Sequence, residues 1–453
     1  MEEFYKSKKG NLTIWIQKEN NIKFATMAAS FSRTDIPTQT LLQTKFSGEV
    51  NDELIGLIFA EYGDKSVGKL INISLIVDGM SIYDAMCLKE SRIGNACIEA
   101  STRYLNFSNT SHTGDNPLIA DWLSLYSRML PVAEKHIRET KPREKEIELP
   151  AYESAVKAEA FDICREMLPM AMVTRLGATI NFLTLTRNIH KWRRSDRSAV
   201  CDLAELLTNY VQEHLPYLVK ALDNDHSPYI NDVETIIDGD IPADEPFETP
   251  IRVECLRSTP TQYMLNNECH RLNARTSRHK IIPRELEKDL YECTFSIPFH
   301  AARDMMRHVF VTKTKCFIDP GYVSEVLAFK DETSPLMAFK SEFNNWLTKT
   351  IHGHTDISVF PMCTRMDIEM TINLRSLIYM TELRTSDGVH PTIYSIFDSI
   401  AKSIMPYFKM LNVDKGVFFT SARINLARLE SERRKLRRQQ RLKKLTPLVV
   451  EKK

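Results

Sequence analysis

Apolar residues recur at spacings of three and four along much of this chain, a period that predicts amphipathic helices. The period is clearest in four segments, Ala151–Leu168, Ser198–Val219, Arg375–Leu383 and Ile393–Phe408. Two shorter segments alternate or are rich in β-branched residues, which is typical of strands, and these are Leu70–Val77 and Glu292–Ile297. The pattern predicts an α+β fold that is rich in helix and built as two similar units.

One motif occurs twice with the same internal spacing. Pro169-Met170 is followed by Thr179-Ile180-Asn181, and Pro361-Met362 is followed by Thr371-Ile372-Asn373. The offset of 192 residues is shared by both anchors, which indicates a tandem duplication. A chain of 453 residues also exceeds the size at which one core keeps growing. We therefore expect two diverged domains, 1–222 and 250–420, each with a small sheet flanked by long helices.

Two charged segments lie outside these domains. The segment 223–249 holds nine acids and three prolines without a Lys or Arg, which predicts a linker. The segment 421–453 holds twelve Lys or Arg against three Glu and predicts a mostly solvated helix that ends before Pro447. Its residues 423–444 are candidates for binding nucleic acid, although such a run is at least as often a solubilising extension or a clamp on an acidic subunit.

Composition narrows the chemistry further. No apolar run reaches the roughly 20 residues of a membrane span, and the start lacks the apolar segment of a signal peptide, so we expect a cytoplasmic protein. Nine cysteines without a C-x-x-C pair predict buried free thiols, and His352-Gly353-His354 without acidic or thiol partners does not predict a metal site. With 14 glycines and no glycine-rich phosphate loop, any nucleotide must be held by side chains.

The residues that could carry chemistry form an ordered set. In the first half they are Gly63-Asp64-Lys65-Ser66, Arg92 and Glu99-Ala100-Ser101-Thr102-Arg103-Tyr104. In the second half they are Arg307-His308, Asn373-Leu374-Arg375 and Arg384. The set resembles the flavin-dependent thymidylate synthase (ThyX) family, whose pattern runs as G-H-x-S, R-H-R, E-x-S-x-R-Y and a distal N-x-R with a further Arg eleven residues after the Asn.

Each half is an incomplete version of that pattern. The first half has Glu90-Ser91-Arg92 in place of R-H-R, and Leu183 and Trp192 at the positions of the distal arginines. The second half keeps Arg307-His308 but has Phe317-Ile318-Asp319-Pro320 where S-x-R-Y is expected. The losses are complementary, so intact sites could be assembled from both halves.

The resemblance implies a role for each retained residue. Ser101 and Arg103, with Glu99 and Tyr104 beside them, would bind the phosphate of dUMP or a similar nucleotide, because a guanidinium gives bidentate phosphate contacts. Arg384 and Arg307 would act at the uracil, where positive charge stabilises developing negative charge. The residues that would contact the flavin are Ser66, Arg92, His308, Asn373 and Arg375.

The implied reaction is reductive methylation of dUMP to dTMP, with FAD as cofactor and methylene-tetrahydrofolate and NADPH as co-substrates. In the resembled family the site is assembled between subunits of a homotetramer. A duplicated chain would therefore form a homodimer that is a pseudo-tetramer, with composite sites.

Two other classes remain open. The chain could be a non-catalytic descendant of the same fold, because Asp64, Glu90, Ser91 and Val309 stand at expected flavin positions. It could also be a structural or nucleic-acid-associated subunit that acts through its basic tail. Arg375 and Arg384 are nine residues apart, so on one regular helix they would lie on opposite sides, and each could simply form a surface ion pair.

Overall fold

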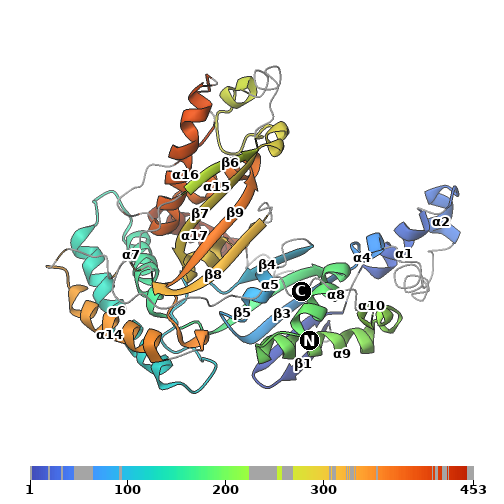
Figure 1. Cartoon of the computed structure of the whole chain (residues 1–453), viewed down its shortest axis with the longest axis horizontal. Helices are drawn as coiled ribbons and strands as arrows, with labels where there is room; N and C mark the ends of the chain where they lie inside the picture. The colour runs from blue at the N-terminus through green and yellow to red at the C-terminus, as the bar shows by residue number, and fades with distance from the viewer. Residues whose placement is uncertain are drawn as a thin grey trace. The chain divides into compact units, whose positions relative to one another are not determined.

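The chain forms two compact units in this computed structural model, and each unit contains a sheet and helices (Figure 1). Unit 1 comprises Met1–Ala100, Thr110–Gly114 and Ala171–Glu234, and unit 2 comprises Ser101–Asn109, Asp115–Met170 and Thr235–Lys453. Within these bounds the structure describes residues 3–18, 21–31, 34–44, 65–90, 94–223, 252–257, 269–305, 308, 313–322, 324, 326, 331, 333–353, 356–410, 412–413, 417–420, 426 and 428–445.

The sheet of unit 1 has five antiparallel strands. Their order across the sheet is β1 (Phe4–Lys9), β2 (Leu12–Gln17), β3 (Asn72–Ser81), β5 (Val173–Asn181) and β4 (Asn95–Glu99). Burial alternates along β2 and β3, as expected for strands with one face on a core. Ile73, Leu75 and Val77 point into that core, while Ser74 and Ile76 lie on the opposite face.

The structure describes several helices in unit 1. They are α1 (Ile22–Phe31), α2 (Thr38–Thr44), α4 (Lys65–Gly68), α5 (Met86–Glu90), α8 (Phe182–Trp192), α9 (Ser198–His214), η3 (Pro216–Leu218) and α10 (Lys220–Asp223). The core includes Trp192 and Tyr210 from α8 and α9 together with the inward residues of β2, β3 and β5.

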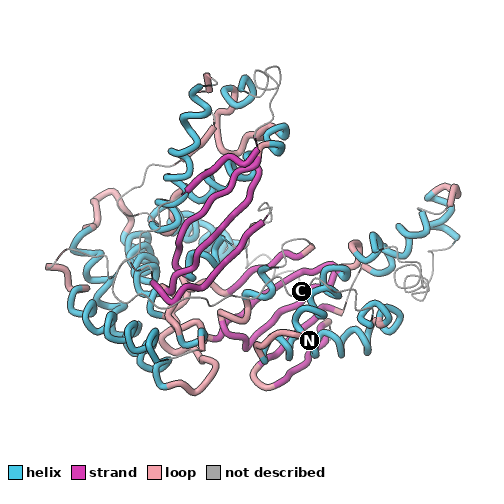
Figure 2. Tube along the Cα trace, viewed as in Figure 1, coloured by secondary structure: helices cyan, strands magenta, loops and turns pink. Residues whose placement is uncertain are grey.

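The sheet of unit 2 has four antiparallel strands, seen as adjacent magenta tubes in Figure 2. Their order is β6 (Arg252–Arg257), β7 (Leu290–Pro298), β9 (Thr364–Asn373) and β8 (Lys313–Tyr322). Short elements η5 (Arg284–Lys288) and α12 (Phe299–Met305) flank β7, and α15 (Leu374–Arg384) and α16 (Pro391–Met410) follow β9. Phe295 of β7 packs edge-on against Phe397 of α16, with ring centroids 6.4 Å apart.

Unit 2 also contains a helical layer drawn from distant parts of the chain. It comprises α6 (Pro117–Thr140), α7 (Leu149–Cys164), η2 (Arg165–Met167), α14 (Met337–Gly353), η6 (Ile357–Val359) and α17 (Leu429–Leu445). Trp122 of α6 is fully buried, stacks edge-on against Phe343 and donates from Nε1 to Thr350 Oγ1 at 3.1 Å. Helices far apart in sequence therefore share one core.

The elements that follow the two Pro-Met motifs correspond closely. Helix α8 covers 182–192 and α15 covers 374–384, so both bounds differ by the offset of 192 residues. Each helix is capped by the Asn that ends the preceding strand. Asn181 Oδ1 accepts from Thr184 N, and Asn373 Oδ1 accepts from Ser376 N, both at 2.8 Å.

The Pro-Met motifs themselves contact each other within unit 2. Pro169 and Pro361 form an antiparallel bridge. Met170 N donates to Phe360 O at 2.9 Å, and Met362 N donates to Leu168 O at 2.8 Å. At the offset of 192, Met170 corresponds to Met362 and Leu168 to Phe360, so exchanging these counterparts turns one bond into the other. Contacts about a two-fold axis are paired in this way.

The structure confirms the predicted helix-rich α+β fold, the four predicted helices and both predicted strands within a few residues. Apart from Asp223, which ends α10, the predicted linker 223–249 lies outside the described residues. The four cysteines that are buried are Cys87, Cys164, Cys293 and Cys363, and three more are half-buried among the residues described. No helix in the described ranges is long and apolar enough to cross a bilayer.

The prediction of a mostly solvated tail helix is wrong at its first turn. Helix α17 forms and lies before Pro447, but Arg428, Leu429 and Glu432 are buried. Ser154 Oγ of α7 donates to Glu432 Oε2 at 2.7 Å, and Arg433 pairs with Glu148 at 3.0 Å. These hydrogen-bonded and ionic contacts hold the first turn of α17 against α7. Composition alone does not reveal such contacts.

The two helix caps predict matched losses of stability. Replacing Asn181 or Asn373 by Ala should each lower the free energy of unfolding by about 1 kcal/mol, because an orphan backbone N–H loses its acceptor. Urea unfolding of the purified variants measures this. Asn→Ser at the same positions keeps an acceptor, so equal stability of the Ala and Ser variants would contradict the capping role.

Candidate functional site

A cluster of arginines surrounds one buried carboxylate in unit 2. Arg103 lies in the turn that follows Ser101, where Ser101 Oγ accepts from Arg103 N at 3.2 Å. The Arg103 guanidinium binds Asp162 of α7 in a bidentate manner, with Nε to Oδ1 at 2.7 Å and Nη2 to Oδ2 at 2.9 Å. Nη2 also donates to Gly388 O at 2.8 Å, while Nη1 has no partner among the described residues. That nitrogen is available to a ligand.

Arg428 approaches the same groups from the start of α17. Its Nη1 donates to Gly388 O at 3.0 Å and its Nη2 to Arg103 O at 3.4 Å. Its Nε lies 3.5 Å from Asp162 Oδ2. The guanidinium also lies over the ring of Tyr104, 4.7 Å from the centroid, as in a cation–π contact.

Arg165 of η2 is 1% exposed and lies next to Asp304 of α12, with Nη1 3.5 Å from Oδ2. Its Nε and Nη2 have no hydrogen-bond partner among the described residues. Burial lowers the pKa of Arg165 to about 10, although Asp304 raises it, so the side chain still carries its charge at neutral pH. A buried guanidinium with unused donors is suited to an anionic ligand.

Two neutral histidines stack beside these arginines. The rings of His300 and His390 lie edge to face with centroids 4.9 Å apart. His390 Nε2 lies 3.3 Å from Asp162 O, and its Nδ1 accepts from Thr392 N at 3.3 Å, which assigns the proton to Nε2. Burial, with Arg165 and His390 nearby, lowers the pKa of His300 well below its usual value. Neither ring nitrogen of His300 has a hydrogen-bond partner in the described part of the chain.

Arg384 closes the cluster from the last position of α15. Its Nε donates to His308 Nε2 at 2.9 Å, and its Nη2 donates to the backbone oxygen of Asp304. The carboxylate of Asp304 in turn pairs with Arg165. Arg103 and Arg384 therefore belong to one electrostatic cluster linked through Asp304, whose charge also raises the pKa of Arg103.

The charges of the cluster do not balance. It holds five arginines, which are Arg103, Arg165, Arg303, Arg384 and Arg428. Two carboxylates, Asp162 and Asp304, oppose them, and the two stacked histidines are neutral. Since most of these groups are buried, their charge is poorly screened by solvent. The unused guanidinium donors of Arg165 in this buried setting suit an anion with several acceptor oxygens, such as a phosphate.

The family model of the thymidylate synthase complementing proteins, Thy1, matches residues 14–217. The matched segment is less than half of the chain, and the match shows that this part is similar to the Thy1 family. The resemblance to flavin-dependent thymidylate synthases predicted from the motifs is thereby confirmed. Ser101, Arg103, Asp162 and Arg165 all lie within the Thy1 segment, whereas Arg384 and Arg428 lie beyond it.

Similar proteins extend over both halves of the chain. A UPF0159 protein of Chlamydia pneumoniae is 23% identical over 440 residues, which cover 83% of this chain and 82% of that protein. A UPF0159 protein of Chlamydia muridarum is 22% identical and covers 77% of this chain and 78% of its own length. A third, of Thermoplasma acidophilum, is 21% identical over 90% of this chain and 97% of its own. These similarities extend beyond the Thy1 segment.

Solved structures also show similarity. A crystal structure of thymidylate synthase X from Helicobacter pylori with FAD and dUMP is 18% identical, with a TM-score of 0.30 over 45% of this chain and 96% of that chain. A second structure of the Helicobacter pylori enzyme with FAD and dUMP is 15% identical, with a TM-score of 0.28 over 45% of this chain and 95% of that chain.

The structure brings together some of the residues predicted from the Thy1 motifs. Ser101, Arg103, Tyr104, His308 and Arg384 lie in unit 2, at or beside the cluster. Each of them has the residue type that the motif predicts at its place in the sequence. A ligand role for any of them is a separate proposal.

Other predicted residues lie elsewhere. Asn373 and Arg375 lie at the opposite end of α15 from Arg384, where Arg375 pairs with Glu287 and donates to Ile282 O. Ser66 is exposed on α4 of unit 1. Glu99, also in unit 1, forms a buried ion pair with Lys89. Arg92 and Arg307 lie outside the described residues.

Sequence reasoning missed five residues of the cluster, namely Asp162, Arg165, Asp304, His390 and Arg428. A signal existed for Arg165, because it lies four residues before the first Pro-Met motif while Ile357 occupies the matching place in the second half. Arg165 is thus another residue kept in one half and absent from the other. No sequence signal separates Arg428 from the other cations of the tail.

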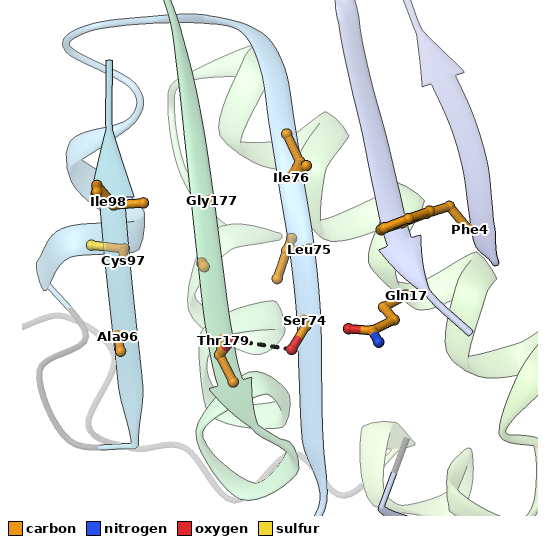
Figure 3. A pocket seen from close by; sticks show the side chains of 11 residues that line it. Phe4, Gln17, Ser74, Leu75, Ile76, Ala96, Cys97, Ile98, Gly177 and Thr179 are labelled. Atoms are coloured by element: carbon orange, nitrogen blue, oxygen red, sulfur yellow. Dashed lines mark hydrogen bonds between the residues drawn. The ribbon is translucent and has the colours of Figure 1, made fainter. Parts of the chain in front are cut away.

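A groove of about 480 Å³ lies on the outer face of the unit 1 sheet (Figure 3). Ile76, Gly177 and Ile98 form one cross-strand row along it, and Ser74 Oγ lies 3.1 Å from Thr179 Oγ1. None of the residues predicted for the site lines this groove. The described ranges contain no group of three or more metal-ligating side chains either.

The buried pair of Arg103 and Asp162 predicts a pH dependence of stability. Burial raises the pKa of Asp162, but the charges of Arg103, Arg428 and Arg165 outweigh it and hold the pKa well below its usual range. The carboxyl therefore stabilises the fold fully above its unfolded pKa of about 3.9, and this stability is lost as the pH falls towards the depressed folded pKa.

Urea unfolding between pH 7 and pH 3 measures this dependence. Asp162→Asn should cost about 3 to 5 kcal/mol at pH 7, because buried guanidinium charges lose their partner. The variant should also lose less stability than the wild-type protein on acidification. Parallel pH profiles for the two proteins would refute the assignment.

Proposed function

We propose that the arginine cluster of unit 2 binds the phosphate of dUMP, and that the chain acts as a flavin-dependent thymidylate synthase. The observation that carries this proposal is that Asp304 links the two halves of the site. Its backbone accepts from Arg384 and its carboxylate pairs with Arg165, three residues after the Asp162 that binds Arg103. The motifs of Arg103 and Arg384 predicted opposite ends of one nucleotide site from two separate halves of the sequence. The Thy1 match over residues 14–217 supports the same reading.

The phosphate would lie between Arg103 and Arg165. Arg103 Nη1 and the Nε and Nη2 of Arg165 are three donor nitrogens that no described residue uses. Guanidinium donors of this kind bind phosphate oxygens in a planar, bidentate manner. Ser101 adds a hydroxyl in the same turn, and neutral His300 adds one ring N–H donor.

Arg384 would act at the pyrimidine. Its guanidinium is held by His308 and by the backbone of Asp304, so its orientation is set before a ligand arrives. A fixed positive charge there stabilises negative charge that develops on the pyrimidine oxygens during methyl transfer.

The two halves are proposed to be diverged copies. Matched bounds of α8 and α15, matched Asn caps and the reciprocal bonds between the Pro-Met motifs support this. The phosphate-binding residues survive in the first copy and the base-binding residues in the second. A homodimer would then correspond to the homotetramer of the resembled family.

Asn373 uses its side-chain oxygen as a helix cap, and Arg375 is engaged by Glu287. Along α15, Arg375 and Arg384 are separated by a rise of about 14 Å. His308 alone among the described flavin candidates of unit 2 touches the cluster, so no step of the reaction is derived through the flavin.

This dispersion favours a second candidate function, a nucleotide-binding relative without catalysis. The phosphate end of the site would be retained, and the flavin end would be lost. Colour separates the two candidates. Purified protein with a flavin absorption band, or protein that takes up added FAD, supports the enzyme, whereas protein that binds dUMP but not FAD supports the relative.

Variants of the two halves test the site. Arg103→Ala, Arg165→Ala and Arg384→Ala should each weaken dUMP binding about tenfold or more, because each removes a charge-assisted contact. Isothermal titration calorimetry measures this. Arg193→Ala, at an exposed position of unit 1, is the matched control and should bind dUMP as the wild-type protein does. Full affinity in Arg103→Ala or Arg384→Ala would refute the site.

Mixing tests where the site is built. Arg103 and Arg384 meet within one chain, so two inactive variants that are dissociated, mixed and reassembled should remain inactive together. The readout is dTMP formation in anaerobic incubation with dUMP, methylene-tetrahydrofolate, FAD and NADPH. Recovery of activity on mixing would instead show a site shared between chains, and no dTMP from the wild-type protein would favour the non-catalytic relative.

A further inference from the structure

The C-terminal helix contacts the nucleotide turn at one residue, Arg428. This residue is 2% exposed and begins α17, where its carbonyl accepts the first helical bond from Glu432 N at 3.0 Å. Its side chain points away from the helix and makes four contacts with the site, to Gly388, Arg103, Asp162 and Tyr104. The neighbouring Arg434 is exposed and bonds only within its own helix, to Glu430 O at 3.3 Å.

Arg428 and Arg103 share their acceptors. Gly388 O accepts from Arg103 Nη2 at 2.8 Å and from Arg428 Nη1 at 3.0 Å. Asp162 binds both guanidinium groups. Two cations held against one carboxylate repel each other, and the shared carboxylate and carbonyl offset that repulsion. The position of each guanidinium therefore depends on the other.

Arg428 also holds the backbone of the turn. Its Nη2 donates to the carbonyl of Arg103, and its guanidinium lies over the ring of Tyr104, a residue that remains 45% exposed. Lys435, two turns along α17, lies over the same ring at 5.1 Å. Within the turn, Tyr104 N and Leu105 N both bond to Ser101 O at 3.2 Å. The backbone and side chain of the turn are thus both fixed from α17.

The anchor of α17 lies on the helix that carries Asp162. Glu432 is bound by Ser154, and Arg433 by Glu148, both within or next to α7. Arg428 therefore contacts the turn from a helix that is anchored on α7, the same helix that carries Asp162. The C-terminal helix is outside the Thy1 segment, so this support is a property of the longer chain.

We propose that Arg428 is a positioning residue that holds the turn from Ser101 to Tyr104, and with it the guanidinium of Arg103, ready to bind a phosphate. The ligand part of this inference rests on the proposed binding of dUMP. The turn itself is ordered by Arg428 whether or not a nucleotide is present. Arg428 does not touch the ligand, and it acts through Arg103.

Hydrogen–deuterium exchange of the full-length protein without nucleotide tests the positioning directly. In Arg428→Ala the amides of residues 103–105 should exchange at least about tenfold faster than in the wild-type protein, because the turn loses its carbonyl contact and its cover. In Arg434→Ala, a matched loss of an exposed cation from the same helix, exchange should be unchanged. Unchanged exchange in Arg428→Ala overturns the inference, whatever the protein binds.

Calorimetry with two ligands tests the link to phosphate. Arg428→Ala should weaken dUMP binding about tenfold and leave the binding of deoxyuridine, which lacks the phosphate, unchanged. Equal weakening of both ligands would show a general disturbance and overturn the role of Arg428 in positioning Arg103. A wild-type protein that binds neither ligand would refute the proposed function, and the exchange experiment would still decide the inference.

Arg428→Lys covers the case in which the Ala variant unfolds. Lysine keeps the charge and can lie over Tyr104, but it cannot bridge the carbonyls of Gly388 and Arg103 as a planar fork does. Thermal melting should show a folded variant, while exchange at residues 103–105 should still be faster than in the wild-type protein. A Lys variant that matches the wild-type protein in exchange and in dUMP affinity would overturn the inference.

Discussion

The carboxylate of Asp162 is the group on which the rest of the candidate site depends. It is buried on α7 and binds Arg103 through both oxygens, with Arg428 at its edge and Arg165 three residues along the chain. Without it, several guanidinium groups would be brought together in a medium that screens them poorly. Because Asp162 orders the guanidinium groups of Arg103 and Arg428, the unused donors of Arg165 lie beside an organised set of cations, and a phosphate would meet these donors.

Much of the fold could be predicted from periodicity, because buried helix faces and alternating strands leave a local signature. The helices α7, α9, α15 and α16 were predicted for this reason. Strands β1 and β2 were not, because their outward positions carry Lys and other polar residues and each strand is only six residues long. The grouping of α6 and α7 with the second sheet in unit 2 was also beyond prediction, since contact between distant segments leaves no local pattern.

The site shows the same division between local and non-local information. Arg103 and Arg384 could be chosen because motif spacing marks them. Asp162 could not, because it is one of several acids on α7, and what distinguishes it from the equally buried Glu159 is its pairing with Arg103 and Arg428 from distant parts of the chain. Asn373 shows that a residue matched by a motif can also have a local structural role. Its motif suggested a flavin contact, yet in the structure its side-chain oxygen is occupied by the amide of Ser376, a local role that the spacing of strand and helix already demanded.

The reciprocal bonds between the two Pro-Met motifs have a consequence for synthesis of the protein on the ribosome. The amide of Met170 and the carbonyl of Leu168 bond to residues about 190 positions later in the chain. At translation rates of roughly 5 to 20 residues per second, the first half waits on the order of 10 to 40 seconds before its partner emerges. During that interval the nascent chain presents a short unpaired backbone edge, where a second ribosome's product could bind in place of the proper half.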